Sequence, residues 1–214
     1  MDKVELQKLR EEYSLSSLDE SDVLQNPIEQ FKQWIQEALK AGVPEPNAMN
    51  LATVDKDGKP HSRIVLLKGF DEKGFVFFTN YASDKGREIE ANPNVSLCFF
   101  WIELERQVRI DGVAKKISKE ESEAYFKSRP NKSQIGALAS NQSEVVENRL
   151  FLEQKFEKLE AKFTEGEVPM PETWGGYVIK PSALEFWQGR RSRLHDRIKY
   201  EWKADNWIIK RLSP

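Results

Sequence analysis

Four arginines, a histidine and an aspartate follow a Phe-Trp pair in FWQGRRSRLHDR, residues 186–197. The chain carries a formal net charge of −2 and only two histidines, so this concentration of cations is local. If RLHDR is a strand, its side chains alternate between faces, and Arg193, His195 and Arg197 point the same way. Two guanidinium groups beside an imidazole, next to the aromatic wall of Trp187, suit a flat anionic ligand. The alternative is the solvated face of an edge strand.

A second polar cluster lies in YFKSRPNKS. Tyr125 and Arg129 are four residues apart and share a helix face, Pro130 ends that helix, and Ser133 follows in the turn. Two hydroxyls and a guanidinium that converge near a helix end would bind a phosphate. An ordinary surface helix terminus has the same pattern and stays an open alternative.

A third cluster combines the strand RIVLLK with the segment TNYASDK. Arg63 and Lys68 bracket four apolar residues of an expected core strand, and Thr79, Ser83 and Lys85 follow the next strand. Together they predict a second phosphate site, although charges at the ends of a buried strand usually just reach solvent. His61, in a turn region before this strand, is expected on the surface.

Several other classes of protein are disfavoured by the sequence. There is no GxGxxG, GxxxxGK[ST] or GxSxG motif, and a net charge of −2 argues against a nucleic-acid binder. Cys98 is the single cysteine, so no internal disulfide forms; we expect a buried, inert thiol and no metal site. No apolar run approaches the roughly 20 residues of a membrane span, and the charged N-terminus does not resemble a signal peptide. A cytoplasmic protein without membrane partners is expected.

Hydrophobic periodicity and turn residues predict the elements that hold these clusters. The predicted strands are 48–55, 61–70, 75–80, 94–101, 106–117, 177–188, 193–202 and 206–212. Helices are expected at residues 3–13, 83–92, 133–140 and 144–163. Two more helices should begin after the Asn26 cap and after the Ser118 capping box. The helix after Asn26 carries an apolar stripe of Ile28, Phe31, Trp34, Ile35 and Leu39. The longest helix should pack against the sheet, with a coiled coil as the alternative. Because βαβ alternation is missing, we predict a mainly β chain: an antiparallel barrel of six to eight strands with peripheral helices.

In chain order, RIVLLK, FFTN, ERQVR, YFKSRP with SQIGA, QS, WGG, FWQG and RLHDR resemble the pyridoxine (pyridoxamine) 5′-phosphate oxidase family. The resemblance runs from about residue 10 to the C-terminal RLSP. It implies a homodimer with FMN-binding split β-barrels, with FMN at the subunit interface. It also implies oxidation of phosphorylated B6 vitamers to pyridoxal 5′-phosphate by hydride transfer from C4′ to the flavin, with O2 reduced to H2O2. Residues 1–25 would cover the active site, and 26–214 would form one domain.

The resemblance also implies the roles of individual residues. Those lining the flavin would be Arg63, Ile64, Val65, Leu66, Leu67, Lys68, Phe78, Thr79, Lys85, Gln107, Gln142, Ser143, Trp187 and Arg197, some of them from the partner subunit. The substrate would contact Arg10, Tyr13, Lys68, Tyr125, Arg129, Ser133, Arg193, Leu194 and His195. Of these, Arg193 and His195 would be catalytic, placed over the substrate ring.

The chain departs from the family's pattern at two positions. Asp84 stands where a basic residue usually precedes the flavin-phosphate lysine, which weakens the expected phosphate contact unless Arg87 substitutes. Glu45 stands where an aspartate is usual, and we assign it no role. Asp84 is the main support for the alternative, a non-enzymatic FMN- or pyridoxal-phosphate-binding protein. Another split-barrel flavin reductase is a further alternative, but it would not explain the SRPxxS cluster.

Overall fold

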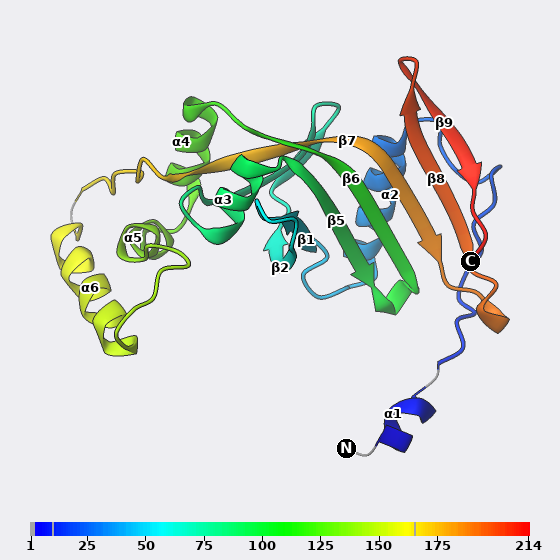
Figure 1. The fold of residues 1–214 in the computed structure, drawn as a ribbon, viewed down its shortest axis with the longest axis horizontal. Helices are drawn as coiled ribbons and strands as arrows, with labels where there is room; N and C mark the ends of the chain where they lie inside the picture. Colours follow the sequence, from blue (N-terminus) through cyan, green and yellow to red (C-terminus); the bar gives the residue numbers. More distant parts are fainter. Residues whose placement is uncertain (1–2, 10, 165) are drawn as a thin grey trace. The chain divides into compact units, whose positions relative to one another are not determined.

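The computed structural model describes residues 3–9, 11–164 and 166–214. Its strands are β1 (Ala48–Val54), β2 (Pro60–Leu66), β3 (Gly69–Asp71), β4 (Gly74–Asn80), β5 (Asn94–Trp101), β6 (Arg106–Lys116), β7 (Trp174–Gln188), β8 (Asp196–Lys203) and β9 (Asn206–Arg211). Its helices are α1 (Lys3–Lys8), α2 (Pro27–Lys40), α3 (Asp84–Ala91), α4 (Lys119–Ser128), α5 (Asn131–Ala139) and α6 (Arg149–Lys162), with short 3₁₀ turns η1 (Ile102–Leu104) and η2 (Arg191–Arg193). The fold is mainly β with helices, as predicted (Figure 1).

The strands form a sheet in the order β2-β1-β5-β6-β7-β4-β3, with β8 paired to β7 and β9 to β8. The chain divides into two compact units. The first unit is Met1–Asn50, Ser96–Asp111 and Pro181–Pro214, and the second unit is Leu51–Val95 and Gly112–Lys180. The predicted boundary between residues 1–25 and 26–214 stays a prediction.

The first unit has its core between α2 and the strands. Asn26 caps α2 by accepting from the Ile28 N–H, and Pro27 occupies the first turn, as predicted. The apolar stripe then packs on the sheet: the Phe31 ring lies 5.1 Å from that of Phe99 in β5, and the Trp34 ring 5.1 Å from that of Phe186 in β7. Leu39, expected in the stripe, is 62% exposed instead, because α2 ends within the next turn.

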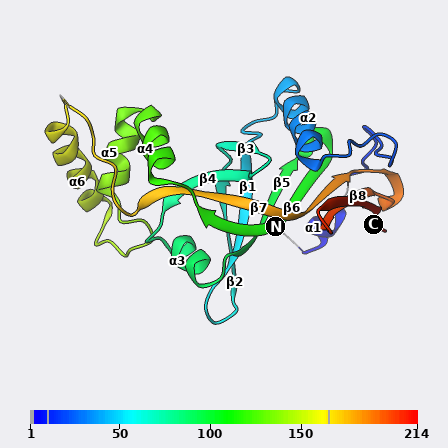
Figure 2. The same cartoon turned by 90° about the horizontal axis from the view of Figure 1, so that it is seen from above.

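The second unit pairs β4 with Trp174–Ile179 of β7 and packs Phe77 on Tyr177. Figures 1 and 2 show α4, α5 and α6 gathered at the start of β7. There Phe126, Ile135, Val168 and Trp174 form a buried cluster that Phe156 and Leu159 of α6 cover from one side. The predicted packing of α6 on the sheet holds only in part: its apolar side meets α5 and this cluster, to which the sheet contributes Trp174 of β7.

Three further expectations about elements are wrong. RIVLLK is not one core strand, because β2 lies at the edge of the strand order with partly buried or exposed side chains and ends at Leu66, before Leu67 and Lys68. RLHDR is mostly not a strand, because β8 begins only at Asp196. Over the residues that the structure describes, the sheet has nine strands rather than six to eight, because Gly69–Asp71 forms the separate short strand β3. Among the described residues, no helix is both long and apolar enough to cross a bilayer.

Candidate active site

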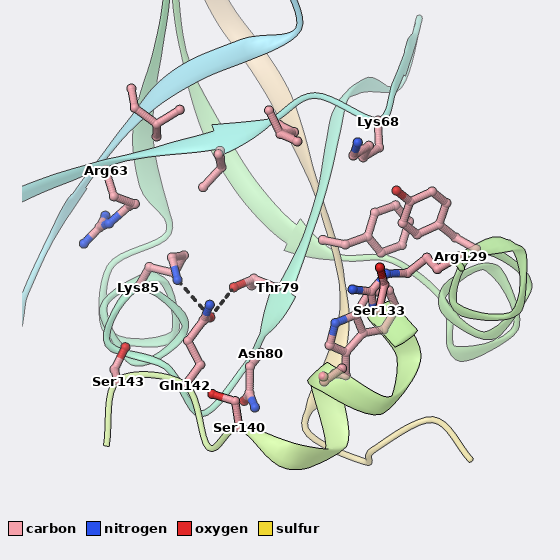
Figure 3. Close-up of a pocket in the computed structure, with 18 of the residues that line it drawn as sticks. Arg63, Lys68, Thr79, Asn80, Lys85, Arg129, Ser133, Ser140, Gln142 and Ser143 are labelled. Carbon is pink, nitrogen blue, oxygen red and sulfur yellow. Dashed lines mark hydrogen bonds between the residues drawn. The ribbon is translucent and has the colours of Figure 1, made fainter. Parts of the chain in front are cut away.

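A pocket of about 860 Å³ opens in the second unit (Figure 3). Its volume is that of a site for a cofactor or another drug-sized ligand. The predicted residues that line it are Arg63, Ile64, Val65, Leu66, Lys68, Phe78, Thr79, Lys85, Tyr125, Arg129, Ser133, Gln142 and Ser143. Leu67 is not among them; its side chain is 5% exposed and belongs to the core. Two of the three polar clusters found in the sequence thus meet in one cavity.

One side of the pocket is formed around the N-terminus of α3. The Ser83 hydroxyl caps this helix by accepting from the Gly86 N–H. Lys85 follows in the first turn, and its Nζ donates to Gln142 Oε1 at 3.0 Å, an oxygen that also accepts from the Thr79 hydroxyl at 3.1 Å (dashed lines, Figure 3). Burial, with the nearby charge of Arg63, lowers the pKa of Lys85 below its usual value. A buried ammonium group held mainly by neutral groups is suited to an anion.

Arg63 reaches the same side of the pocket from β2. Its Nη2 pairs with Glu88 of α3 at 2.8 Å, and its Nη1 donates to the Thr53 hydroxyl. Glu88 Oε2 also accepts from that hydroxyl at 2.5 Å. This network, in which Thr53 and Glu88 are buried, attaches α3 to β1 and β2.

The opposite side of the pocket carries Lys68, Arg129 and Ser133 (Figure 3). Arg129 ends α4 with an extended backbone, as a residue before proline must. Its guanidinium carbon lies 5.0 Å from the centre of the Trp174 ring, and its Nη1 is buried with no hydrogen-bond partner among the described residues. Burial lowers the pKa of Arg129. A buried donor of this kind calls for an anionic acceptor from outside the chain.

An aromatic stack forms the wall beside Arg129. The Tyr125 ring lies 3.9 Å from that of Phe78 with 18° between their planes, and the Phe78 ring lies 5.3 Å from that of Trp174 with 11° between them. Sequence reasoning gave Trp174 no role, although the WGG motif marked its position. It also gave no role to the lining residues Asn80, Gly136, Ala137 and Ser140, although the first three lie in the motifs FFTN and SQIGA.

Asp84 also lines the pocket, at the first position of α3. Arg87 does not line it; its Nη2 pairs with Asp84 Oδ1 at 2.6 Å, and both side chains are more than half exposed. Arg87 therefore neutralises the unexpected carboxylate and does not replace a missing basic residue in the cavity. Lys68 and Arg129 have no carboxylate partner among the described residues.

The remaining predicted residues lie in the first unit, around the segment 187–197. The Trp187 and His195 rings are 4.7 Å apart, and the Tyr13 ring meets both edge-on, at 5.7 Å and 5.9 Å. Gln107 is half-buried in β6, Leu194 is exposed, and Arg10 lies outside the described residues.

His195 is held in one orientation because its Nδ1 accepts from the Arg190 N–H at 3.1 Å. Burial and the charge of Arg193 lower the pKa of His195. The neutral ring with its proton on Nε2 satisfies both observations, so Nε2 is a hydrogen-bond donor.

The predicted cationic strip of Arg193, His195 and Arg197 is wrong as an alternating strand. Ser192 and Arg193 adopt left-handed backbone angles, with φ of 56° and 59°, which place Arg193 in a turn before β8. Arg197 does lie in β8, but its Nε and Nη2 pair with the buried Glu185 at 2.9 and 3.1 Å. That carboxylate raises the pKa of Arg197, and nothing in RLHDR alone predicts the pair.

Sequence comparisons cover nearly the whole chain. The family described as pyridoxamine 5′-phosphate oxidase matches residues 35–163, and the pyridoxine 5′-phosphate oxidase C-terminal dimerisation region matches residues 174–214. A pyridoxine/pyridoxamine 5′-phosphate oxidase of Cupriavidus pinatubonensis is 57% identical over 211 residues, which cover 98% of this chain and 99% of the relative. One of Leptospira biflexa is 56% identical over 210 residues with the same coverage.

Two solved structures share the fold. PhzG from Burkholderia lata 383, in complex with tetrahydrophenazine-1-carboxylic acid, is 31% identical with a TM-score of 0.89, over 94% of this chain and 100% of that one. An FMN-binding, pyridoxamine 5′-phosphate oxidase-related protein of Nostoc punctiforme is 18% identical with a TM-score of 0.68, over 86% and 97%. The predicted split-barrel fold is confirmed.

Proposed function

The chain belongs to the pyridoxamine 5′-phosphate oxidase family, and we propose that it oxidises pyridoxine 5′-phosphate or pyridoxamine 5′-phosphate to pyridoxal 5′-phosphate. The cofactor is FMN, and O2 takes up the electrons to give H2O2. The observation that carries the proposal is the buried, unpaired Nη1 of Arg129 in a pocket whose opposite side bears Arg63 and Lys85. Two separate cationic sides in one cavity suit two phosphorylated ligands.

The residues of the pocket fit FMN. Lys85 and Arg63 would hold its phosphate, with hydrogen bonds from Thr79 and Ser143, and residues 64–66 of β2 would line its ring system. When bound, FMN accepts a hydride from C4′ of the substrate and passes the electrons to O2. The chain contributes orientation and electrostatics: the two cationic sides fix each ligand by its phosphate.

The substrate phosphate would bind Arg129, Lys68, Tyr125 and Ser133. The guanidinium of Arg129 offers two parallel donors to phosphate oxygens, and its place over Trp174 limits its rotation. The Tyr125 hydroxyl belongs to the same aromatic stack, so it is positioned by packing. A substrate without its phosphate would leave Arg129 desolvated and unpaired, which gives a physical basis for requiring the phosphate.

Arg193 and His195 would complete the site from a second copy of the chain. The family's dimerisation region, residues 174–214, contains Trp187, Arg193, His195 and Arg197, which supports a homodimer whose sites draw on both subunits. His195 would donate from Nε2 to the substrate and orient it. Its Nδ1 is occupied by the Arg190 N–H, so we do not assign it the role of general base.

The test is an aerobic H2O2 assay with added FMN and each of the two phosphorylated vitamers. We expect H2O2 in stoichiometric amounts with pyridoxal 5′-phosphate, and bleaching of the flavin absorbance when oxygen is excluded. A yellow protein that neither bleaches nor makes H2O2 is a binding protein only. A protein that bleaches with a reduced nicotinamide but not with the vitamers is a reductase.

The likeness to PhzG favours one further candidate, a flavin oxidase of reduced phenazines. Such a substrate carries a carboxylate and no phosphate. A reduced phenazine would leave the Arg129 side of the pocket without a phosphate group to bind, so we rank this candidate second. The same assay with a reduced phenazine carboxylate separates the two, because the phenazine oxidase alone would turn it over in preference to the vitamers.

A further inference from the structure

Tyr13 lies beside the Trp187 and His195 rings, and the two residues after it are hydrogen-bonded to a carboxylate of the first unit. Glu105 follows η1 at the start of β6 with a left-handed backbone, φ 52° and ψ 40°. Its Oε2 accepts from two successive backbone N–H groups, that of Ser14 at 2.7 Å and that of Leu15 at 2.9 Å. Bonds from N–H donors to an ionised oxygen are about twice as strong as neutral ones.

The backbone of Glu105 is hydrogen-bonded to the end of β7, directly before the turn that leads to Arg193 and His195. Glu105 O accepts from the Gly189 N–H at 2.7 Å and from Gln188 Nε2 at 3.3 Å. Gln188 is fully buried, and its Oε1 accepts from Arg106 Nε at 2.9 Å. Glu105 is thus fixed to the end of β7 by its main chain and to the N-terminal segment by its side chain.

Tyr13, Gly189 and Glu105 are in close contact where these two attachments meet. A Cβ atom at Gly189 would lie 2.7 Å from Tyr13 Cβ and 3.0 Å from Glu105 Cβ, so glycine alone fits between them. Tyr13 is held by this packing with its ring against those of Trp187 and His195.

Other anchors act further along the segment. Asp196 Oδ2 accepts from the Leu18 N–H at 3.0 Å, and Arg211 pairs with Asp19 and Glu20 at 2.9 and 2.7 Å. Within the described part of the chain, the hydrogen bonds that tie residues 13–17 to the rest of the first unit end on Glu105. The Glu105 carboxylate therefore fixes the backbone directly after Tyr13, and ring packing holds the Tyr13 side chain itself.

We propose that Glu105 is a positioning residue for substrate binding: its carboxylate fixes residues 13–15 so that Tyr13 closes over the His195 side of the active site. The inference rests on the proposed function, because only a substrate that reaches His195 would sense Tyr13. It assigns Glu105 no contact with substrate or flavin. Loss of the carboxylate should weaken substrate binding and leave the chemical step and the flavin site unchanged.

The experiment compares Glu105→Ala and Glu105→Gln with Glu103→Ala, a matched control at an exposed carboxylate of η1. For pyridoxine 5′-phosphate we expect Glu105→Ala to raise KM about tenfold with kcat within about twofold, since two charge-assisted bonds are lost. Glu105→Gln keeps an acceptor oxygen and should lie between Ala and wild type. Glu103→Ala should match wild type, and FMN affinity should be the same in all four proteins.

A second readout follows the segment itself. Chymotrypsin cleavage after Tyr13 and Leu15, measured by mass spectrometry on the intact protein, should be about tenfold faster in Glu105→Ala than in wild type or Glu103→Ala. Unchanged KM and cleavage in Glu105→Ala would overturn the inference, and so would equal losses of kcat and FMN binding, which indicate a general structural role. A wild-type protein that makes no H2O2 refutes the proposed function instead, whatever the variants do in the cleavage assay.

Discussion

Replacing Arg129 with methionine should separate stability from function. The residue is unusual because burial lowers its pKa and leaves its Nη1 without a partner, while its guanidinium lies over Trp174. An unpaired buried donor costs about 1–3 kcal/mol, and a cation over an aromatic ring returns about 0.5–2 kcal/mol. The two contributions nearly cancel. Methionine keeps the length and the apolar contacts, so the free energy of unfolding without ligands should stay within about 2 kcal/mol of wild type.

The effect on the reaction should be far larger. Truncating one partner of a buried, hydrogen-bonded charge pair costs about 2–5 kcal/mol, so kcat/KM for pyridoxine 5′-phosphate should fall between about 30-fold and about 4,000-fold. Unphosphorylated pyridoxine, which makes no such contact, should be oxidised by Arg129→Met at close to the wild-type rate. The ratio of the two kcat/KM values therefore measures the phosphate contact directly.

The assay pairs urea unfolding of the flavin-free protein with steady-state kinetics of the loaded enzyme. Lys127→Met is the control, since Lys127 sits in the last turn of α4 and pairs with Glu167 at 3.4 Å on the exposed surface. The reasoning is refuted if Arg129→Met loses more than about 3 kcal/mol of stability, the cost of breaking a satisfied buried pair. It is equally refuted if kcat/KM for the phosphorylated substrate stays within about threefold of wild type.

Three further predictions follow from the described contacts. Arg193→Leu should lower kcat/KM by about two orders of magnitude or more with FMN retained, because it removes a cation from the substrate ring and not from the flavin pocket; unchanged turnover would exclude Arg193 from the site. Asp84→Asn should tighten FMN about two- to fivefold in a fluorescence titration, with the gain shrinking as salt is added, since it removes a carboxylate that lines the pocket. The pKa of His195 lies below its ordinary value of 6.5, so the folded chain binds fewer protons than the unfolded one: its contribution to stability is complete above that value and is lost as pH falls through the lower folded pKa. Urea unfolding from about pH 7.5 to about pH 5 should therefore show a steeper loss for wild type than for His195→Gln, and parallel curves would contradict this.

Features of this chain that depend on near neighbours can be read from its amino-acid order. The Asn26 cap with Pro27 and the Ser118–Glu121 capping box placed the starts of α2 and α4, because these contacts form within one helical turn. The ordered motifs from RIVLLK to RLHDR gave the family and thereby most of the residues that line the pocket. Their roles toward FMN and substrate remain predictions.

How these residues come together depends on contacts between distant parts of the chain. Lys85 and Gln142, which are hydrogen-bonded, are 57 positions apart, and Ser14 and Glu105 are 91 apart. Contacts between residues so distant in sequence leave no hydrophobic pattern from which they could be predicted. The turn at Ser192 and Arg193 overrides the strand pattern of RLHDR because its backbone is set by β7, β8 and the Arg190–His195 bond. Arg129 is suited to bind an anion because its Nη1 is buried without a partner and its guanidinium lies over Trp174, and this burial arises only in the packed chain. The local sequence determines which side chains are present. Their burial, their hydrogen bonds and the shifts of their pKa values depend on residues far away along the chain.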